Sequence, residues 1–321
     1  MFRKIGSVLG VTLALGLAGA AMGQEVTLRA VSSFAEGTAY SRPFERFVEK
    51  VNAEGKGLIQ INYIGGPKAI PAFETGNAVR AGVVDMANST GAFYTNIMPE
   101  ADALKLSTVP MSVQRKNGAF EYINKIWNEK MGVYYLARTV GDNPFHLYLN
   151  KKIDKPDLTG LKIRITPVYR DFFQALGATV VQTPPGEVYT ALERGVVDGY
   201  GWPITGIFDL GWHERTKYRV DPGFYSAEVS VIVNLNVWRR LTDEQRAFLE
   251  KQALWLESLH AEQAKLNEED AKKQAAVGIE TITFPDDVAR EYVRKAYEIG
   301  WQGIIAKSPE HGPKLRELLS K

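Results

Sequence analysis

The feature that most constrains the fold is an eight-residue pattern that occurs twice in the chain. Residues 78–85 read AVRAGVVD, and residues 191–198 read ALERGVVD. In each copy a helix-forming stretch meets a glycine, Gly82 or Gly195, which can adopt the left-handed conformation that ends a helix. The two β-branched valines that follow favour the start of a strand. Because the copies lie too far apart for a repeat solenoid, they predict two similar α/β lobes.

A loop rich in polar or aromatic residues follows each of these predicted strands. The first copy leads into residues 88–91, with sequence NSTG, and the second into residues 200–203, with sequence YGWP. Open α/β sheets bind ligands outside the carboxyl ends of their strands. Two such loops facing each other predict a cleft between the lobes.

The first 23 residues have the pattern of a secretory signal peptide. Arg3 and Lys4 precede an apolar run over residues 8–21, and small residues surround the expected cleavage site at Gly23. This run is shorter than the roughly 20 residues of a membrane-spanning helix, and an uncleaved anchor is the alternative interpretation. We therefore expect a soluble, exported mature chain. The sequence contains no cysteine, so the exported chain would depend on its hydrophobic core instead of disulfides.

Charge gives no indication of a nucleic-acid or membrane-surface partner. The full chain has 39 Lys and Arg against 37 Asp and Glu residues. Removal of the signal peptide takes Arg3 and Lys4 with it and leaves no net formal charge. Because the two signs are interspersed, the mature surface lacks the basic patch that nucleic-acid binding needs.

Hydrophobic periodicity along the mature chain predicts strands that alternate with amphipathic helices. The predicted strands are 26–31, 58–64, 161–165, 180–181 and 196–200, and the predicted helices are 39–52, 169–176 and 186–194. This βαβ rhythm predicts an α/β fold with parallel-rich sheets flanked by helices. Residues 145–149 and 225–236 would be the strands that cross between the lobes.

The longest helix signal runs from Asp243 to Val277, after a capping box at Thr242 and Gln245. A helix of this length would exceed one small lobe and bridge both. The alternative is two helices broken near Asn267. The expected division gives 24–148 and about 236–275 to the first lobe, and 149–235 and about 276–321 to the second.

Residues with catalytic or metal-binding patterns are few. The four histidines lack metal-ligand spacing, and the mature chain has no nucleophile elbow, phosphate loop or calcium loop. His260, inside the long helix, is interpreted as a surface or packing residue. We therefore predict no catalytic residues, metal or cofactor, with an exported two-lobed enzyme that uses a pair of acids as the alternative.

Arg164 is the most informative single residue. It lies in the run LKIRITPVYR, residues 161–170, near the end of a strand that should be buried and just before a helix start at Thr166. A buried guanidinium needs a partner, and its planar fork matches a carboxylate. The local sequence leaves two partners open: the carboxylate of a ligand, or an internal acid such as Asp198 or Glu187.

The order of these segments resembles the extracytoplasmic solute-binding subunits of tripartite ATP-independent periplasmic (TRAP) transporters, of the dicarboxylate-binding-protein type. The resemblance covers nearly the whole mature chain, and its more specific elements are LKIR at 161–164 and GVVDG at 195–199. It implies two lobes around a cleft in a type II-like periplasmic binding fold, with a long helix spanning both. It also implies that Arg164 clamps a ligand carboxylate and that the small and large permease subunits are partners. The binding subunit of another importer type is the alternative.

Two departures from the family pattern bear on the ligand. Many relatives have an asparagine where this chain has Trp202, and often an aromatic residue where it has Pro185 and Gly186. An indole in place of an amide predicts a pocket with a flat apolar wall and few polar groups, suited to a hydrophobic or aromatic monocarboxylate. The predicted ligand-binding residues are Arg164, Trp202, Tyr169, Phe34, Phe73, Thr90, Phe93, Thr166 and Tyr200.

Overall fold

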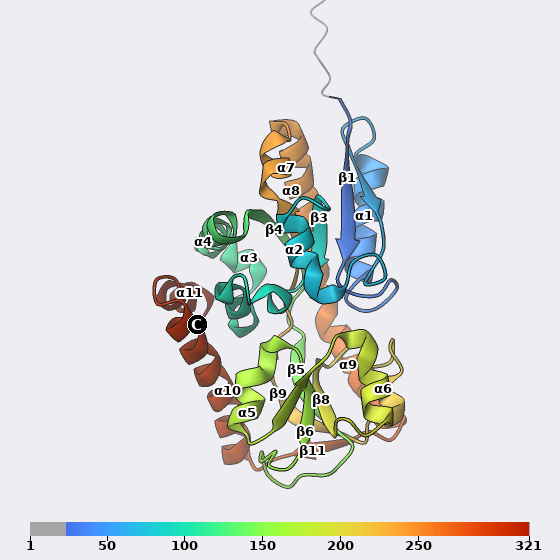
Figure 1. Ribbon diagram of the computed structural model, residues 1–321, viewed down its shortest axis with the longest axis vertical. Helices are drawn as coiled ribbons and strands as arrows, with labels where there is room; N and C mark the ends of the chain where they lie inside the picture. The colour runs from blue at the N-terminus through green and yellow to red at the C-terminus, as the bar shows by residue number, and fades with distance from the viewer. Residues whose placement is uncertain (1–23, 321) are drawn as a thin grey trace, which may run out of the picture.

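The computed structural model describes residues 24–320, and the predicted signal peptide lies outside this range. Two lobes, each built on one sheet, are stacked along the long axis of the molecule (Figure 1). The first sheet has the strand order β2-β1-β3-β10-β4. Its strands are β1 (Val26–Ser32), β2 (Ile59–Tyr63), β3 (Met86–Ser89), β4 (Val133–Val140) and β10 (Val229–Asn234).

The second sheet has the strand order β11-β9-β5-β8-β6-β7. Its strands are β5 (Pro144–Leu149), β6 (Lys162–Ile165), β7 (Thr179–Gln182), β8 (Gly199–Pro203), β9 (Tyr218–Ser226) and β11 (Glu280–Thr283). The α-helices are α1 (Arg42–Glu54), α2 (Thr75–Arg80), α3 (Met111–Gln114), α4 (Ala119–Ile126), α5 (Arg170–Ala175), α6 (Val188–Glu193), α7 (Leu235–Arg240), α8 (Asp243–Ser258), α9 (Gln263–Ala276), α10 (Asp286–Lys307) and α11 (Gly312–Leu319). The predicted α/β class with helices around parallel-rich sheets is confirmed.

Each sheet combines a parallel part with one strand that arrives from the other lobe. β1 pairs in parallel with β2 and β3, whereas β10 is antiparallel to β3 and β4. In the second sheet β6 is parallel to β7 and β8, whereas β5 is antiparallel to β8 and β9. The crossing strands therefore make both sheets mixed.

The strand pairing differs from the expected lobe boundaries in two places. β5 begins at Pro144 and belongs to the second sheet, although the first lobe was expected to run to residue 148. β10 belongs to the first sheet, although residues 149–235 were expected in the second lobe. The chain crosses between the lobes before each of these strands, in the short segments 141–143 and 227–228. Each strand therefore pairs in the lobe that the chain has just entered. In addition, α11 contacts α4 on the first lobe.

The repeated pattern forms the same local structure in both lobes. Gly82 and Gly195 have φ angles of 73° and 65°, in the left-handed region where glycine avoids steric cost. The strands begin only after the aspartate of each copy, so the prediction that the two valines start them is wrong. The first valine of each pair is exposed because it lies in the turn, and the second is buried in the core.

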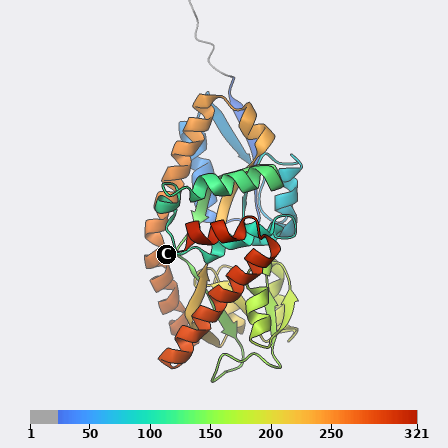
Figure 2. The same cartoon turned by 90° about the vertical axis from the view of Figure 1, so that its left-hand side faces the viewer.

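The long helical segment is interrupted near its middle. α8 and α9 are joined by a 3-10 turn over Leu259–Glu262, not by a break at Asn267. α8 packs on α1 and β4 in the first lobe, whereas Gln274 of α9 donates a hydrogen bond to the Ile204 carbonyl in the second. The segment spans both lobes, as predicted (Figures 1 and 2).

His260 lies in this 3-10 turn and has a packing role. Its Nε2 is 3.0 Å from the Arg138 carbonyl, beside the crossover from β4 to β5. Burial lowers the pKa of His260 to about 4, so the ring is neutral at pH 7. The position fits the interpretation of His260 as a packing residue.

A second helix also joins the lobes. α10 contacts β9 and α5 in the second lobe and the 3-10 helix η3 (Pro99–Leu106) in the first. Figure 2 shows it leaning across both. Among residues 24–320, no helix is long and apolar enough to cross a membrane.

Candidate ligand-binding cleft

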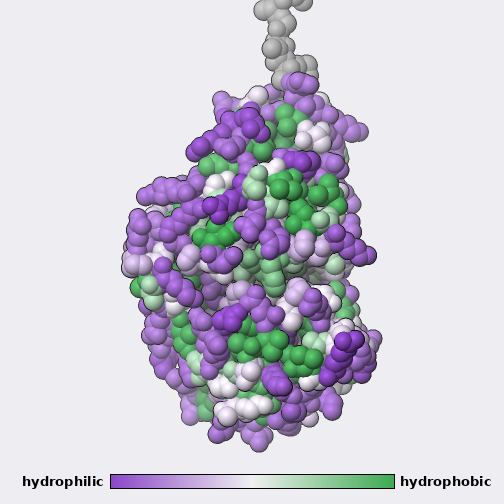
Figure 3. All heavy atoms as spheres, in the orientation of Figure 1, coloured by the Kyte–Doolittle hydropathy of each residue, from purple (hydrophilic) through white to green (hydrophobic). Residues whose placement is uncertain are grey.

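A large cavity lies between the lobes, and both lobes contribute residues to its wall. It has a volume of about 640 Å³. Its first-lobe wall includes Phe34, Tyr40, Pro71 and Phe73, and its second-lobe wall includes Pro184, Pro185, Trp202 and Leu210. On the face in Figure 3 the lobes meet at a waist, with hydrophobic residues above and below it. We call this cavity the apolar chamber.

A smaller cavity of about 30 Å³, which we call the inner cavity, shares Phe34, Tyr40 and Trp202 with the apolar chamber. Six of the predicted site residues line it together: Phe34, Thr90, Phe93, Thr166, Tyr169 and Trp202. Phe73 lines the apolar chamber, as Phe34 and Trp202 also do. Residues from both sequence halves thus meet in one place. Arg164 and Tyr200 do not line either cavity.

Trp202, near the end of β8, is fixed by aromatic contacts on two sides. Its ring meets Tyr40 of the first lobe edge to face, with centroids 5.4 Å apart, and Trp212 of its own lobe at 4.6 Å. The Tyr40 hydroxyl donates to the Thr205 carbonyl at 3.0 Å, which is a direct bond between the lobes. Edge-to-face pairs of this kind hold ring orientation. Trp202 therefore forms a rigid wall where the lobes touch.

Arg164 lies in the layer behind this wall and has no exposed surface. Its Nε and Nη2 both donate to the Thr183 carbonyl, at 3.1 and 2.6 Å, and its Nη1 donates to the Tyr169 hydroxyl at 3.2 Å. The guanidinium carbon lies 5.7 Å from the centre of the Trp202 ring, within the range of a cation–π contact. The edge expected to hold a carboxylate thus carries a backbone carbonyl.

The two internal acids proposed as partners of Arg164 do not pair with it. Asp198 pairs with Lys151 at 2.7 Å, and Glu187 is exposed. In the described part of the chain, Arg164 forms no ion pair with any acid. Burial lowers the pKa of its guanidinium, but arginine stays protonated at physiological pH. A buried positive charge without a carboxylate partner therefore lies directly behind the cleft.

Tyr200 is placed in the core of the second lobe. Its ring stacks on Tyr148 with centroids 5.0 Å apart, and its hydroxyl is 2.8 Å from the Thr216 hydroxyl. Tyr200 and Trp202 lie on the same face of β8, but Tyr200 is near the start of the strand and only Trp202 is near its interlobe end. Tyr200 is therefore not carried into the proposed site.

The inner cavity is also lined by Glu228, an acid that is not among the predicted site residues. Glu228 lies in the crossover between β9 and β10 and accepts a hydrogen bond from the Gly91 amide at 2.9 Å. Burial raises the pKa of this carboxyl group, and the nearby Arg138 opposes the shift. Nε and Nη2 of Arg138 have no hydrogen-bond partner. The sequence did offer a signal for Glu228, because it is the one acid within the apolar crossing segment 225–236.

Glu228 adds a carboxyl group to a cleft that was predicted to have few polar groups. A metal site does not follow from it. Within residues 24–320, no group of three His, Cys, Asp or Glu side chains is arranged to hold a metal ion.

Two α/β lobes, short crossovers and a cleft lined from both sides define a two-lobed solute-binding protein. Residues 31–307 match the family model described as bacterial extracellular solute-binding protein, family 7. The chain belongs to this family, whose members are binding proteins and not enzymes, and it is a TRAP-type solute-binding protein.

Three similar proteins illustrate the family. The monocarboxylate 2-oxoacid-binding periplasmic protein of Nostoc sp. PCC 7120 is 25% identical over 79% of this chain and 73% of its own length. A Bordetella bronchiseptica TRAP protein with copurified calcium and picolinate has a TM-score of 0.80 at 21% identity, covering 92% of each chain. A marine metagenome TRAP protein with pyroglutamate has a TM-score of 0.81 at 18% identity, covering 92% of this chain and 99% of its own. At these identities the two structures bear on the fold alone.

Proposed function

We propose that the mature chain captures a small organic carboxylate between its lobes in the periplasm and delivers it to the small and large permease subunits of a TRAP transporter. The observation that carries this proposal is Arg164, fully buried and without an acidic partner among the described residues. A buried charge is costly unless it is paired. An anionic ligand reaching Arg164 would supply the missing charge.

Binding and closure would be coupled through the position of the cleft. Contacts from both walls exist together only when the lobes are closed, so a ligand that touches both favours the closed form. To form a bidentate contact, the ligand carboxylate would have to replace the Thr183 carbonyl on Arg164. Thr183 precedes Pro184 and Pro185, which line the apolar chamber. Displacing the Thr183 carbonyl would therefore shift this part of the chamber wall.

We further propose that the ligand is a hydrophobic or aromatic monocarboxylate, with or without an α-oxo or hydroxyl group. Phe34, Phe73 and Trp202 offer the apolar chamber large ring surfaces. Stacking and burial on such surfaces favour an apolar acid, whereas a polyhydroxylated acid would lose hydrogen bonds there. The name of the Nostoc relative, a monocarboxylate 2-oxoacid-binding protein, supports a small carboxylate as ligand.

A thermal-shift screen of the mature protein tests both statements. The panel contains aromatic, branched, dicarboxylic and polyhydroxylated acids, and each acid is measured with the parent protein and with Trp202→Asn. An acid at 100 times its dissociation constant should add about 2.7 kcal/mol of stability. The parent should prefer apolar monocarboxylates, and Trp202→Asn should reduce that preference. A parent that prefers dicarboxylates, or a substitution that leaves selectivity unchanged, contradicts the ligand class.

A further inference from the structure

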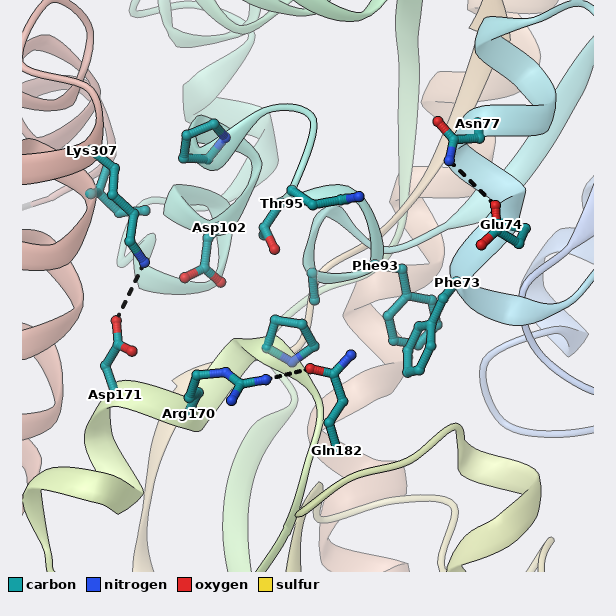
Figure 4. Close-up of a pocket in the computed structure, with 15 residues that line it drawn as sticks. Phe73, Glu74, Asn77, Phe93, Thr95, Asp102, Arg170, Asp171, Gln182 and Lys307 are labelled. Atoms are coloured by element: carbon teal, nitrogen blue, oxygen red, sulfur yellow. Dashed lines mark hydrogen bonds and ion pairs between the residues drawn. The ribbon is translucent and has the colours of Figure 1, made fainter. Parts of the chain in front are cut away.

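A second interlobe cavity of about 440 Å³ lies beside the apolar chamber. The two share Phe73 and Glu74 in their walls, and Phe73 meets Phe93 edge to face at 4.8 Å. The second cavity differs in chemistry, because three amide side chains line it and none lines the apolar chamber (Figure 4). The hydrogen-bonding and basic groups in its wall are Asn77, Thr95, Asn96, Arg170, Gln182 and Lys307. We call it the polar chamber.

Arg170 is the unusual member of this wall. It closes the same LKIRITPVYR run that contains Arg164, yet the two guanidinium groups differ. Arg164 uses all three nitrogens inside the protein, whereas the one hydrogen bond of the Arg170 side chain is from Nη2 to Gln182 Oε1 at 2.5 Å. Nε and Nη1 of Arg170 are therefore unused at the wall of a cavity.

The acids around the polar chamber already have partners. Asp102 is 2.7 Å from Lys105, and Asp171 is 3.6 Å from Lys307. Glu74 accepts a hydrogen bond from Asn77 at 3.3 Å. Arg170 forms no ion pair with any residue in the range 24–320. Of the two cationic side chains in this wall, Lys307 therefore has a carboxylate partner and Arg170 has none in the described part of the chain.

We propose that the polar chamber is a second ligand site, which takes a small hydroxylated carboxylate with Arg170 as its anion anchor. The fork of a guanidinium matches the two oxygens of a carboxylate. Amides of Asn77 and Gln182 both donate and accept, as hydroxyl groups require, and they come from opposite lobes. Phe73 and Phe93 separate this site from the apolar chamber. The site does not depend on the ligand class proposed for that chamber.

Calorimetric titration of the mature protein with two classes of acid tests the assignment. Gluconate, galactonate and glycerate represent hydroxylated acids, and 3-phenylpropanoate represents apolar acids. Arg170→Ala should weaken binding of the hydroxylated acids by at least about tenfold and leave 3-phenylpropanoate within about twofold of the parent. Arg170→Lys keeps the charge and should retain part of the binding. Arg290→Ala, which removes an exposed arginine of α10, is the matched control and should change neither.

The two classes of acid separate the two proposals. Failure of 3-phenylpropanoate to bind bears only on the function proposed for the apolar chamber. The polar-chamber site is overturned if none of the hydroxylated acids binds the parent at about 10 mM. It is also overturned if their binding is the same in the parent, Arg170→Ala and Arg170→Lys. Melting temperatures without ligand establish that each variant is folded.

Discussion

The two lobes place different side chains on equivalent positions of one scaffold. The aspartate of each repeat accepts a hydrogen bond from a backbone amide of the neighbouring strand: Asp85 from Arg29 at 2.8 Å, and Asp198 from Lys162 at 2.9 Å. This shared register makes Val31 of the first lobe the counterpart of Arg164 in the second. Both are fully buried, but one is apolar and the other is charged.

The same register makes Ser89 the counterpart of Trp202. The second lobe therefore carries the buried charge and the indole wall, while the first lobe has a valine and a serine at the matching places. Backbone geometry is thus common to the lobes, and ligand chemistry depends on a few positions where they differ. Changes at those positions should affect binding, and changes at the shared aspartates should affect folding.

The largest expected effect comes from making the second lobe resemble the first at Arg164. Arg164→Ala removes the charge that would pair with the ligand carboxylate, so affinity for the best acid of the screen should fall by roughly 30-fold to several thousand-fold. Arg164→Lys should restore little of it, because a point charge cannot replace the fork. Titration calorimetry measures both. Binding by a folded Arg164→Ala within threefold of the parent would show that the charge has another role.

A smaller and symmetric effect is expected from the shared aspartates. Asp85→Ala and Asp198→Ala each leave a strand amide without its acceptor, which should lower the free energy of unfolding by about 1 to 3 kcal/mol. Asp85→Asn and Asp198→Asn keep an acceptor and serve as controls. Denaturant titrations give the stabilities, and ligand affinity should stay within about twofold. If only one of the two alanine variants loses stability, or if ligand affinity falls sharply, the two aspartates do not have equivalent roles.

Much of the fold could be predicted because it depends on local signals. The glycines that end α2 and α6 and the alternation of strands and helices are visible in the sequence, as is the capping box of α8, which has the predicted bonds between Thr242 and Gln245. The lobe boundaries were harder, since a crossing strand such as β10 has the same apolar composition whichever sheet receives it. Only long-range pairing decides its sheet.

The candidate site was predictable in its membership more than in its geometry. Six predicted residues meet in the inner cavity because they lie at strand ends, where the α/β architecture places ligands. Sequence could not show that Arg164 donates to the Thr183 carbonyl, because that contact joins β6 to the residue that follows β7. Nor could it place Glu228, which reaches the cavity only through the return of the chain at β10. The separation of the cleft into two chambers depends on the packing of Phe73 against Phe93.

The central claim, that an acid is captured between lobes that close around it, is tested most directly by small-angle X-ray scattering of the mature protein. Curves are compared without ligand and with the best acid of the screen, at a saturation verified by calorimetry. Because ligand contacts from both walls form only in the closed state, the radius of gyration should decrease on binding. An unchanged curve at verified saturation would contradict ligand-driven closure and indicate a rigid pocket.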